Sequence, residues 1–213
     1  MLSRPRFRRL LFAAAPVALL LGYFILDRPV AHLAERIPTG WNPVFHSLSF
    51  LAGFPFVTGA GLVMLGFFFL YHPGRPRRSL TPLLYLPVTV LSASLSCELL
   101  KVLLARYRPG MLIDSGLHGF SFWKAGYWHN SFPSGHATVA FALFGALAFS
   151  RPRWRRWAFL AAGLVAASRV LLNLHYLSDI FAGALLGLGW ALLYYRLFAR
   201  FGLPVTPQEA TNG

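Results

Sequence analysis

The sequence predicts an all-α fold, a bundle of six transmembrane helices whose polar functional residues gather at the extracytoplasmic face. Three observations predict this class. Of the 213 residues, 56% are hydrophobic and only 12% are charged, with a mean hydropathy of +0.55, whereas a soluble domain carries about 25% charged residues. Six apolar segments approach the roughly 20 residues that a helix needs to cross a bilayer. Lys and Arg concentrate in alternate loops, which is the pattern that orients membrane helices.

The six apolar segments cover residues 10–26, 49–71, 80–104, 134–150, 157–174 and 179–198. Arginines precede the first segment as they would in a signal peptide. Its apolar run is long, however, and no A-x-A cleavage site follows, so we expect a retained helix. Pro55 interrupts the start of the second segment, which makes its boundary the hardest to place. The fourth segment is short, and we expect the residues at its start to lie at membrane depth.

The chain shows no internal repeat that would divide it. Residues 1–204 are expected to form a single membrane-embedded domain, followed by a short polar tail over residues 205–213. Cys97 is the only cysteine and lies in an apolar run. It therefore cannot form an intramolecular disulfide, and we expect it to pack as a small apolar residue.

The distribution of the 20 Lys and Arg residues sets the expected orientation. With the N-terminus in the cytoplasm, the inner side holds 13 of them and the outer side seven, so both termini are expected in the cytoplasm. In a bacterium this corresponds to a multi-pass protein of the inner membrane. The net charge of +14 does not predict a nucleic-acid partner, because most arginines end apolar runs instead of gathering on one face.

Three short polar clusters lie at the ends of apolar segments that this orientation directs outward. They are KVLLARYRP (residues 101–109), PSGH (133–136) and SRVLLNLHYLSD (168–179). Together they contain cations, two histidines and one of the six carboxylates in the chain. These residue types favour a site that handles a phosphate ester at a bilayer surface.

The third cluster contains the candidate nucleophile. His175 and Asp179 are four residues apart, so within a helix they would share a face and could form a hydrogen bond. A carboxylate on one ring nitrogen fixes the tautomer of the imidazole and leaves the other nitrogen free to attack. The alternative is that the pair only caps the sixth helix, because a carboxylate is also favourable near a helix N-terminus.

The second cluster is expected to bind an anion at the start of the fourth helix. Ser134 fits the N-cap position, and the unpaired N–H groups that follow it form a ready anion site. Gly135 would let a phosphate approach the backbone closely. His136 would then lie beside the anion, where it could act as a general acid for the leaving oxygen. Helix capping alone remains the alternative for Ser134 and Gly135.

Cations in the first and third clusters complete the predicted site. Arg108 can hold two phosphate oxygens at once, and Lys101 supplies a point charge, which Glu98 is expected to compensate. Arg169 lies inside the fifth segment, where a charge is costly and therefore suggests a function. The alternative is that these side chains extend to the membrane surface, and Arg106 fits that interpretation better than Lys101 or Arg108.

The pattern K-x6-RP, PSGH and SR-x5-H-x3-D resembles the three-part signature of the type 2 phosphatidic acid phosphatase family, without a substitution and over residues 101–179. The resemblance implies a phosphatase with a six-helix membrane core that needs no metal or other cofactor. It assigns nucleophilic attack to His175, orientation of that histidine to Asp179, and protonation of the leaving group to His136. It also implies a set of phosphate ligands: Lys101, Arg108, Ser134, Gly135 and Arg169.

The residues themselves do not predict a metal site. A two-metal phosphatase needs several carboxylates, and only Glu98, Asp114 and Asp179 lie near the clusters. His118 and His129 do not have the spacing of a zinc site. The aromatic loop over residues 110–132 leaves two interpretations open, packing at the membrane surface or contact with the substrate.

The resemblance implies an inner-membrane lipid phosphatase that cleaves a phosphomonoester or pyrophosphate lipid at the outer leaflet through a phosphohistidine intermediate. The motifs do not separate phosphatidylglycerophosphate, undecaprenyl pyrophosphate, phosphatidic acid and lipid A phosphate, because they bind the group these lipids share. A lipid-to-lipid phosphotransferase and a relative of the vanadate-dependent haloperoxidases are alternatives. An anionic-lipid transporter would need polar groups along a path across the bilayer, whereas the polar clusters of this sequence lie at one face. The expected partners are a lipid phosphate and the membrane, and no oligomeric state is predicted.

Overall fold

The computed structural model describes residues 14–50, 53–71, 81–203 and 205, and within these residues it is helical, with one isolated β-bridge between Arg106 and Phe120. The longer helices are α2 (Asp27–Glu35), α3 (Asn42–Phe50), α4 (Phe54–Tyr71), α5 (Thr81–Leu104), α6 (Pro109–Ser115), α7 (Gly135–Ser150), α8 (Arg155–Leu171) and α9 (Leu177–Arg200). Short turns of helix are η1 (Gly22–Leu26), η2 (Thr39–Trp41), η4 (Tyr127–His129) and η5 (Pro152–Trp154).

The first helix is longer than predicted. It runs without interruption over Ala14–Glu35 and passes through the π-helical turn η1 into α2, so the predicted end at residue 26 is wrong. The predicted segment ends where the apolar run meets the charged residue Asp27. The Asp27 carboxylate is fully buried and paired with other polar side chains, so the helix continues past it. Residues 10–13 of the predicted segment lie outside the described residues.

The second predicted segment begins too early. The structure has two separate helices there, α3 and α4, and α4 begins at Phe54. Pro55 is the second residue of α4, which is a favourable position because the first N–H groups of a helix have no partner within it. The predicted start at residue 49 therefore falls in α3, a helix that ends at Phe50.

The other four predicted segments coincide with helices to within three residues at each end. They correspond to α5, α7, α8 and α9. Among the described residues, three helices are long and apolar enough to cross a membrane, namely Ala14–Glu35, Leu84–Leu104 and Leu177–Arg200, and two shorter apolar helices cover Phe56–Leu70 and Gly135–Ser150. Large apolar side chains such as Leu70, 80% exposed, face outward, as expected of a chain surrounded by lipid.

The close packing of α7 against α9 positions the second cluster. Gly183 and Gly187 form a GxxxG motif on α9, and small residues at this spacing let two helix backbones touch. A Cβ atom at Gly187 would lie 2.3 Å from the Thr138 carbonyl oxygen, and one at Gly183 would lie 2.7 Å from that of Ser134. The start of α7 therefore rests directly on the first turns of α9.

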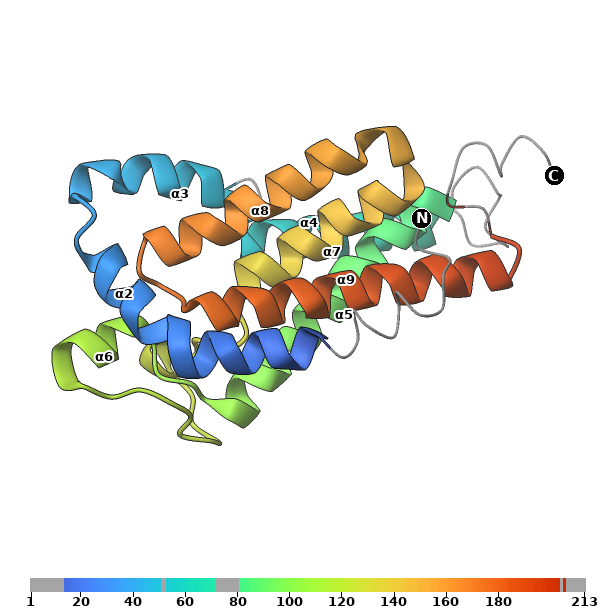
Figure 1. Ribbon diagram of the computed structural model, residues 1–213. Helices are drawn as coiled ribbons and strands as arrows, with labels where there is room; N and C mark the ends of the chain where they lie inside the picture. The colour runs from blue at the N-terminus through green and yellow to red at the C-terminus, as the bar shows by residue number, and fades with distance from the viewer. Residues whose placement is uncertain (1–13, 51–52, 72–80, 204, 206–213) are drawn as a thin grey trace.

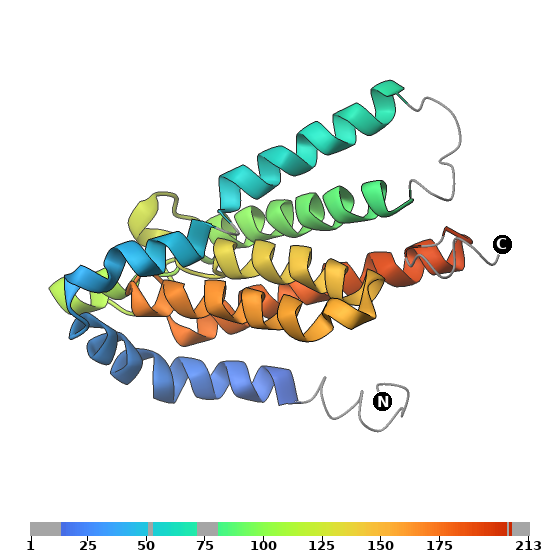
Figure 2. The ribbon, with the colours of Figure 1, turned by 90° about the horizontal axis from the view of Figure 1, so that it is seen from above.

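The ends of the helices separate into two groups (Figures 1 and 2). The ends of α5 and α8 and the starts of α7 and α9 lie near α2, α3 and α6. The end of α9 lies at the opposite end, and the first described helix starts partway along the bundle. In Figure 2, α4 diverges from α5 toward that opposite end. All three polar clusters are thus brought to one end of the bundle.

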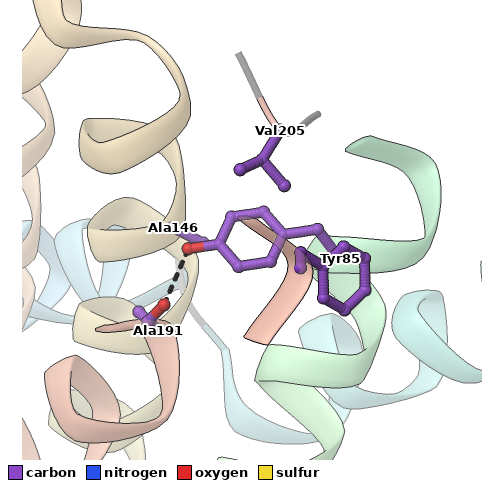
Figure 3. Close-up of a cluster of buried hydrophobic side chains, with 5 residues drawn as sticks. Tyr85, Ala146, Ala191 and Val205 are labelled. Carbon is purple, nitrogen blue, oxygen red and sulfur yellow. Dashed lines mark hydrogen bonds between the residues drawn. The ribbon is translucent and has the colours of Figure 1, made fainter. Parts of the chain in front are cut away.

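A buried apolar cluster joins α5, α7 and α9 toward the other end (Figure 3). It contains Tyr85, Ala146, Ala191, Phe198 and Val205, and the Tyr85 hydroxyl donates to the Ala191 carbonyl oxygen at 2.8 Å. Val205 belongs to the segment expected as a polar tail, but it is fully buried here. Residues 206–213 lie outside the described residues.

Candidate active site

The structure gathers the predicted site residues from five helices and one connection. They occupy the last turn of α5 (Lys101), the N-cap of α6 (Arg108), the start of α7 (Ser134, Gly135 and His136), the last turn of α8 (Arg169), the α8–α9 connection (His175) and the first turn of α9 (Asp179). The positive charges of Arg169, Lys101 and Arg108 all act on His136. Lys101 and Arg169, which are 68 positions apart in the sequence, therefore share one electrostatic environment with His136.

His175 is oriented differently from the prediction. Its Nδ1 atom lies 2.7 Å from the Ser131 carbonyl oxygen and 3.8 Å from Asp179 Oδ2, so the expected hydrogen bond to Asp179 is not made. The prediction assumed that both residues belong to one helix, but α9 begins only at Leu177. A carbonyl oxygen can only accept, so the proton must lie on Nδ1, and Nε2 is left with its lone pair.

The surroundings of His175 keep its imidazole neutral. Burial lowers the pKa of His175 to about 4, the nearby Asp179 carboxylate opposes this effect, and the charges of Arg108 and Arg169 add to it. At neutral pH the ring is therefore uncharged, as a nucleophilic imidazole must be.

Asp179 is fully buried and held by three donors. Its Oδ1 accepts from Arg106 Nη1 at 2.5 Å, and its Oδ2 accepts from Ser131 Oγ at 2.6 Å and from the Tyr176 backbone N–H at 2.8 Å. The last contact is the helix-capping role that the sequence offered as an alternative. Ser131 connects the two partners, because its hydroxyl binds Asp179 and its carbonyl binds His175.

Ser134 and Gly135 form the expected turn at the start of α7. Ser134 is the N-cap residue, but its hydroxyl, fully buried, makes no hydrogen bond to any described residue. Capping therefore does not account for this side chain. The Ser134 N–H donates to the Asp179 carbonyl oxygen at 3.1 Å, while the next N–H groups belong to the first turn of a helix, where no intrahelical acceptor exists. Gly135 is buried and lacks a side chain that would cover these donors.

Arg169 is buried, with 8% of its surface exposed, and lies in the last turn of α8. The helix ends at Leu171, so Arg169 is nearer to the helix end than predicted. Its Nη1 donates to Ser49 Oγ at 3.0 Å, and Ser49 Oγ lies 2.8 Å from Ser168 Oγ. Its Nε has no partner among the described residues. Ser49 is a common residue type in an apolar stretch, so no pattern in the sequence pointed to its role.

Arg108 is held by carbonyl groups and an aromatic ring. Its Nε donates to the Tyr127 carbonyl oxygen at 2.8 Å and its Nη1 to that of Leu174 at 3.1 Å, and its guanidinium lies 4.2 Å from the centre of the Tyr127 ring. The aromatic loop thus positions a predicted phosphate ligand. Trp123, 76% exposed, also fits the alternative of packing at the membrane surface.

Lys101 makes the ion pair that the sequence predicted. Its Nζ lies 2.7 Å from Glu98 Oε1, one helical turn earlier. Its side chain is mostly buried, with 12% exposed, whereas that of Glu98 is half-exposed. The charge of Lys101 is therefore partly compensated before any anion binds.

The interpretation of Arg106 as a residue that extends to the membrane surface is wrong. Its side chain is fully buried and donates to Asp179 and to Asp27. The backbone explains the change of direction: α5 ends at Leu104, and Ala105, with a φ of 46°, turns the chain inward. Asp27 was missed as well, although a rare carboxylate beside an apolar segment is a signal that could have identified it.

Together these groups offer hydrogen-bond donors of the kind that suit a tetrahedral anion. Ser134 Oγ and Arg169 Nε are buried donors without a partner, which is unfavourable unless an acceptor reaches them. The N-terminus of α7 and the Arg108 guanidinium add further donors. Phosphate oxygens are acceptors of the kind that such donors bind, and Nε2 of His175 keeps its lone pair.

Comparisons with known proteins give a family match and two similar sequences. Residues 82–202 match the family described as the PAP2 superfamily. A lipid A 1-phosphatase of Rhizobium johnstonii is 32% identical over 198 residues, which cover 87% of this chain and 79% of that protein. A lipid A 1-phosphatase of Rhizobium etli is 38% identical over 120 residues, 56% of this chain and 51% of that protein.

One solved structure has a similar fold. It is a transmembrane PAP2-type phosphatidylglycerolphosphate phosphatase of Bacillus subtilis, with a TM-score of 0.51, 23% sequence identity, and coverage of 87% of this chain and 96% of that one. At this identity the likeness concerns the fold alone. The family match spans more than half of the chain and includes all three polar clusters, so the chain belongs to the PAP2 superfamily.

Proposed function

We propose that this membrane protein is a lipid phosphatase that works through a phosphohistidine intermediate. The observation that carries the proposal is the arrangement of His175. Its ring is neutral, its Nδ1 is held by the Ser131 carbonyl, and it belongs to the site that contains the unpartnered donors of Ser134 and Arg169.

The proposed reaction has two displacement steps. In the first, Nε2 of His175 attacks phosphorus, the bond from phosphorus to the lipid oxygen breaks, and His136 donates a proton to that oxygen. The imidazole then carries a positive charge, which the Asp179 carboxylate 3.8 Å away stabilises. In the second step, His136 accepts a proton from water, the water attacks phosphorus, and inorganic phosphate and neutral His175 are released.

The charge on the transferring phosphoryl group would be stabilised by the protein itself. Arg108, Arg169, Lys101 and the first N–H groups of α7 provide donors and positive charge in a largely buried site. We therefore propose that the reaction needs no metal ion. Activity should persist in excess EDTA, and vanadate, which can mimic five-coordinate phosphorus, should inhibit.

We propose lipid A 1-phosphate as the first substrate to test, because both Rhizobium relatives carry that activity in their names and one of them aligns with 87% of this chain. Phosphatidylglycerophosphate is the second substrate to test, because the protein with the similar fold is described as a phosphatase of that lipid. Undecaprenyl pyrophosphate and phosphatidic acid share the same phosphate chemistry and complete the panel.

We further propose six membrane crossings in a bacterial inner membrane, with both termini cytoplasmic and the site periplasmic. The excess of Lys and Arg on the expected inner side supports this orientation. It also agrees with the separation of the site from the end of α9 in Figure 1. A reporter fused after Arg200 should stay in the cytoplasm, and one inserted at Ser115 should be exported. An exported C-terminus would reverse the proposed orientation.

The decisive experiment is phosphate release from the lipid panel by the purified protein in mixed micelles, with glycerol phosphate as a soluble comparison. Lipid phosphates should have a much higher kcat/KM, and dilution of the lipid with inert detergent should slow the reaction. His175→Ala should abolish release. A wild-type protein that releases no phosphate from any lipid would refute the proposal. Transfer of the phosphoryl group to a second lipid would identify the phosphotransferase instead.

A further inference from the structure

A buried network of charges connects the first helix to the candidate site. Arg106 is its centre: Nη1 donates to Asp179 Oδ1 and to Ser178 Oγ at 2.7 Å, and Nη2 donates to Asp27 Oδ2 at 2.6 Å. The side chains of Arg106, Asp27 and Asp179 are all completely inaccessible to solvent. One cation is therefore shared between two carboxylates.

Asp27 also holds the backbone next to Asp179. Its Oδ1 accepts from the Ser178 N–H at 2.9 Å, and its Oδ2 accepts from Ser178 Oγ at 2.5 Å. Ser178 immediately precedes Asp179 in the first turn of α9. Gly22 packs closely on the same serine, since a Cβ atom there would lie 3.2 Å from Ser178 Cβ. The first helix thus contacts the segment that presents Asp179.

Aromatic rings enclose the guanidinium of Arg106. Its carbon centre lies 4.3 Å from the centre of the Tyr176 ring, 4.8 Å from that of Tyr23 and 5.5 Å from that of Phe120. His118 Nε2 lies 3.3 Å from Arg106 Nη2. Burial and the charge of Arg106 keep the pKa of His118 below its usual value, so His118 is a neutral acceptor. Charges in such an enclosure act more strongly than they would in water.

The charges in this network do not cancel. Among the buried side chains, two carboxylates and one guanidinium leave an excess negative charge, and one of these carboxylates lies 3.8 Å from His175. The charge of Arg28 also reaches His118 and Tyr176, but this side chain is exposed, so solvent screens its charge. The proposed reaction places positive charge on His175, so this excess would favour the intermediate over the resting state. Asp27 would contribute without touching the substrate, because it neutralises part of the Arg106 charge that would otherwise weaken Asp179.

We propose that Asp27 and Arg106 are positioning residues of the reaction: Arg106 orients Asp179, and Asp27 maintains the negative charge that Asp179 presents to His175. This inference rests on the proposed function. Asp27 lies outside residues 82–202, the part of the chain that matches the family. The first helix would therefore be part of the catalytic apparatus, in addition to anchoring the protein.

The test compares Asp27→Asn with Asp114→Asn. Asp114 lies on α6 and is exposed, so its replacement removes the same charge from the same end of the protein without touching the network. In metal sites, loss of a residue that holds a ligand from behind lowers metal affinity or activity about 10–100-fold. We expect a fall of the same order in kcat for Asp27→Asn, with KM changed less than about twofold, and no change for Asp114→Asn. Inhibition by vanadate should persist in both variants.

The pH profile separates this role from a purely structural one. The groups that face His175 are Asp179 on α9, Arg108 at the start of α6, Arg169 on α8 and His136 on α7. Removing the negative charge of Asp27 disfavours protonation of His175. The acid limb of kcat/KM, which reports the free enzyme, should therefore move to lower pH in Asp27→Asn and return toward the wild-type position in Asp27→Glu.

The outcomes distinguish this inference from the function on which it rests. A wild-type protein with no lipid phosphatase activity would refute both. An active wild type with an Asp27→Asn variant that unfolds at a lower temperature but keeps the kcat and the acid limb of the wild type would overturn the inference alone. If Asp27→Asn cannot be purified, Asp27→Glu and Arg106→Lys keep the charges but change the geometry. They should lower kcat while KM stays constant, and unchanged kcat in both would likewise overturn it.

Discussion

Replacing Ser131 with alanine should lower kcat, because this residue connects the two central groups of the site. The substitution removes the hydroxyl that donates to Asp179 Oδ2 at 2.6 Å but keeps the carbonyl oxygen that accepts from His175 Nδ1 at 2.7 Å. The tautomer of His175 should therefore be preserved, while one of three donors to the Asp179 carboxylate is lost. The perturbation acts on the carboxylate and leaves the nucleophile in place.

The magnitude follows from the kind of hydrogen bond that is removed. A hydrogen bond to a charged group contributes about 1.5–3 kcal/mol. Asp179 keeps its contacts with Arg106 and the Tyr176 N–H, which favours the lower half of that range. If the loss affects the transition state, about 1.4 kcal/mol corresponds to a tenfold change in rate. We therefore expect kcat to fall roughly 10- to 50-fold.

The assay is steady-state phosphate release from a micellar lipid phosphate, together with thermal unfolding. Ser121→Ala is the matched control, since the Ser121 hydroxyl donates to the Ala105 carbonyl oxygen at 2.6 Å in the same loop region and does not contact the site. The control should lose stability only. A Ser131→Ala variant with unchanged kcat and a reduced unfolding temperature would refute the reasoning, because the contact would then be structural alone.

Three further predictions concern the nucleophile, its pKa and a phosphate ligand. His175→Ala should abolish turnover and any covalent intermediate. In His136→Ala the rate should fall about 10²–10⁴-fold and recover partly with an aryl phosphate. Equal recovery of both variants would show that the two roles are misassigned. A pKa of about 4 keeps His175 neutral at pH 5 and above. We therefore expect kcat/KM of the His136→Ala variant on an aryl phosphate to stay flat from pH 7 to about 5, after correction for ionisation of the substrate. A midpoint near 6.5, the usual pKa of histidine, would contradict this. Ser49→Ala should raise KM and weaken vanadate inhibition several-fold, because it releases Arg169. The control Ser47→Ala, which removes an exposed contact with a carbonyl in the same helix, should change neither. Equal inhibition constants for the two variants would contradict the assignment of Arg169 as a phosphate ligand.

The sequence predicted the parts of the fold that depend on local composition. The apolar runs of α5, α7, α8 and α9 were located to within three residues, because length and hydrophobicity suffice to define a helix in lipid. The apolar run of the first helix stops before Asp27, although the helix itself continues to Glu35. A charge beside an apolar run marks the membrane surface unless it is paired, and its partner Arg106 is 79 residues away.

For the candidate site as well, the sequence predicted which residues come together better than it predicted the contacts between them. The three motifs identified residues that the fold does bring to one end, but the hydrogen bonds between them were predicted less well. The spacing of His175 and Asp179 indicated a direct hydrogen bond only if both lay in one helix. The actual acceptor is the backbone carbonyl of Ser131, and nothing in a sequence marks a carbonyl group. Arg106 was misjudged because the choice between membrane surface and interior depends on a buried carboxylate elsewhere in the chain.

The contact of α7 with α9 has a consequence for how the protein responds to its bilayer. A membrane thinner or thicker than the hydrophobic length of a helix is accommodated by tilting or by rearrangement of helices. At Gly183 and Gly187 the two backbones touch, so neither helix can slide along the other without a collision. We therefore expect helices outside this pair to tilt or rearrange when lipid thickness changes, such as α4, which diverges from its neighbour α5 (Figure 2). The anion-binding turn and the carboxylate of α9 would keep their separation in membranes of different thickness.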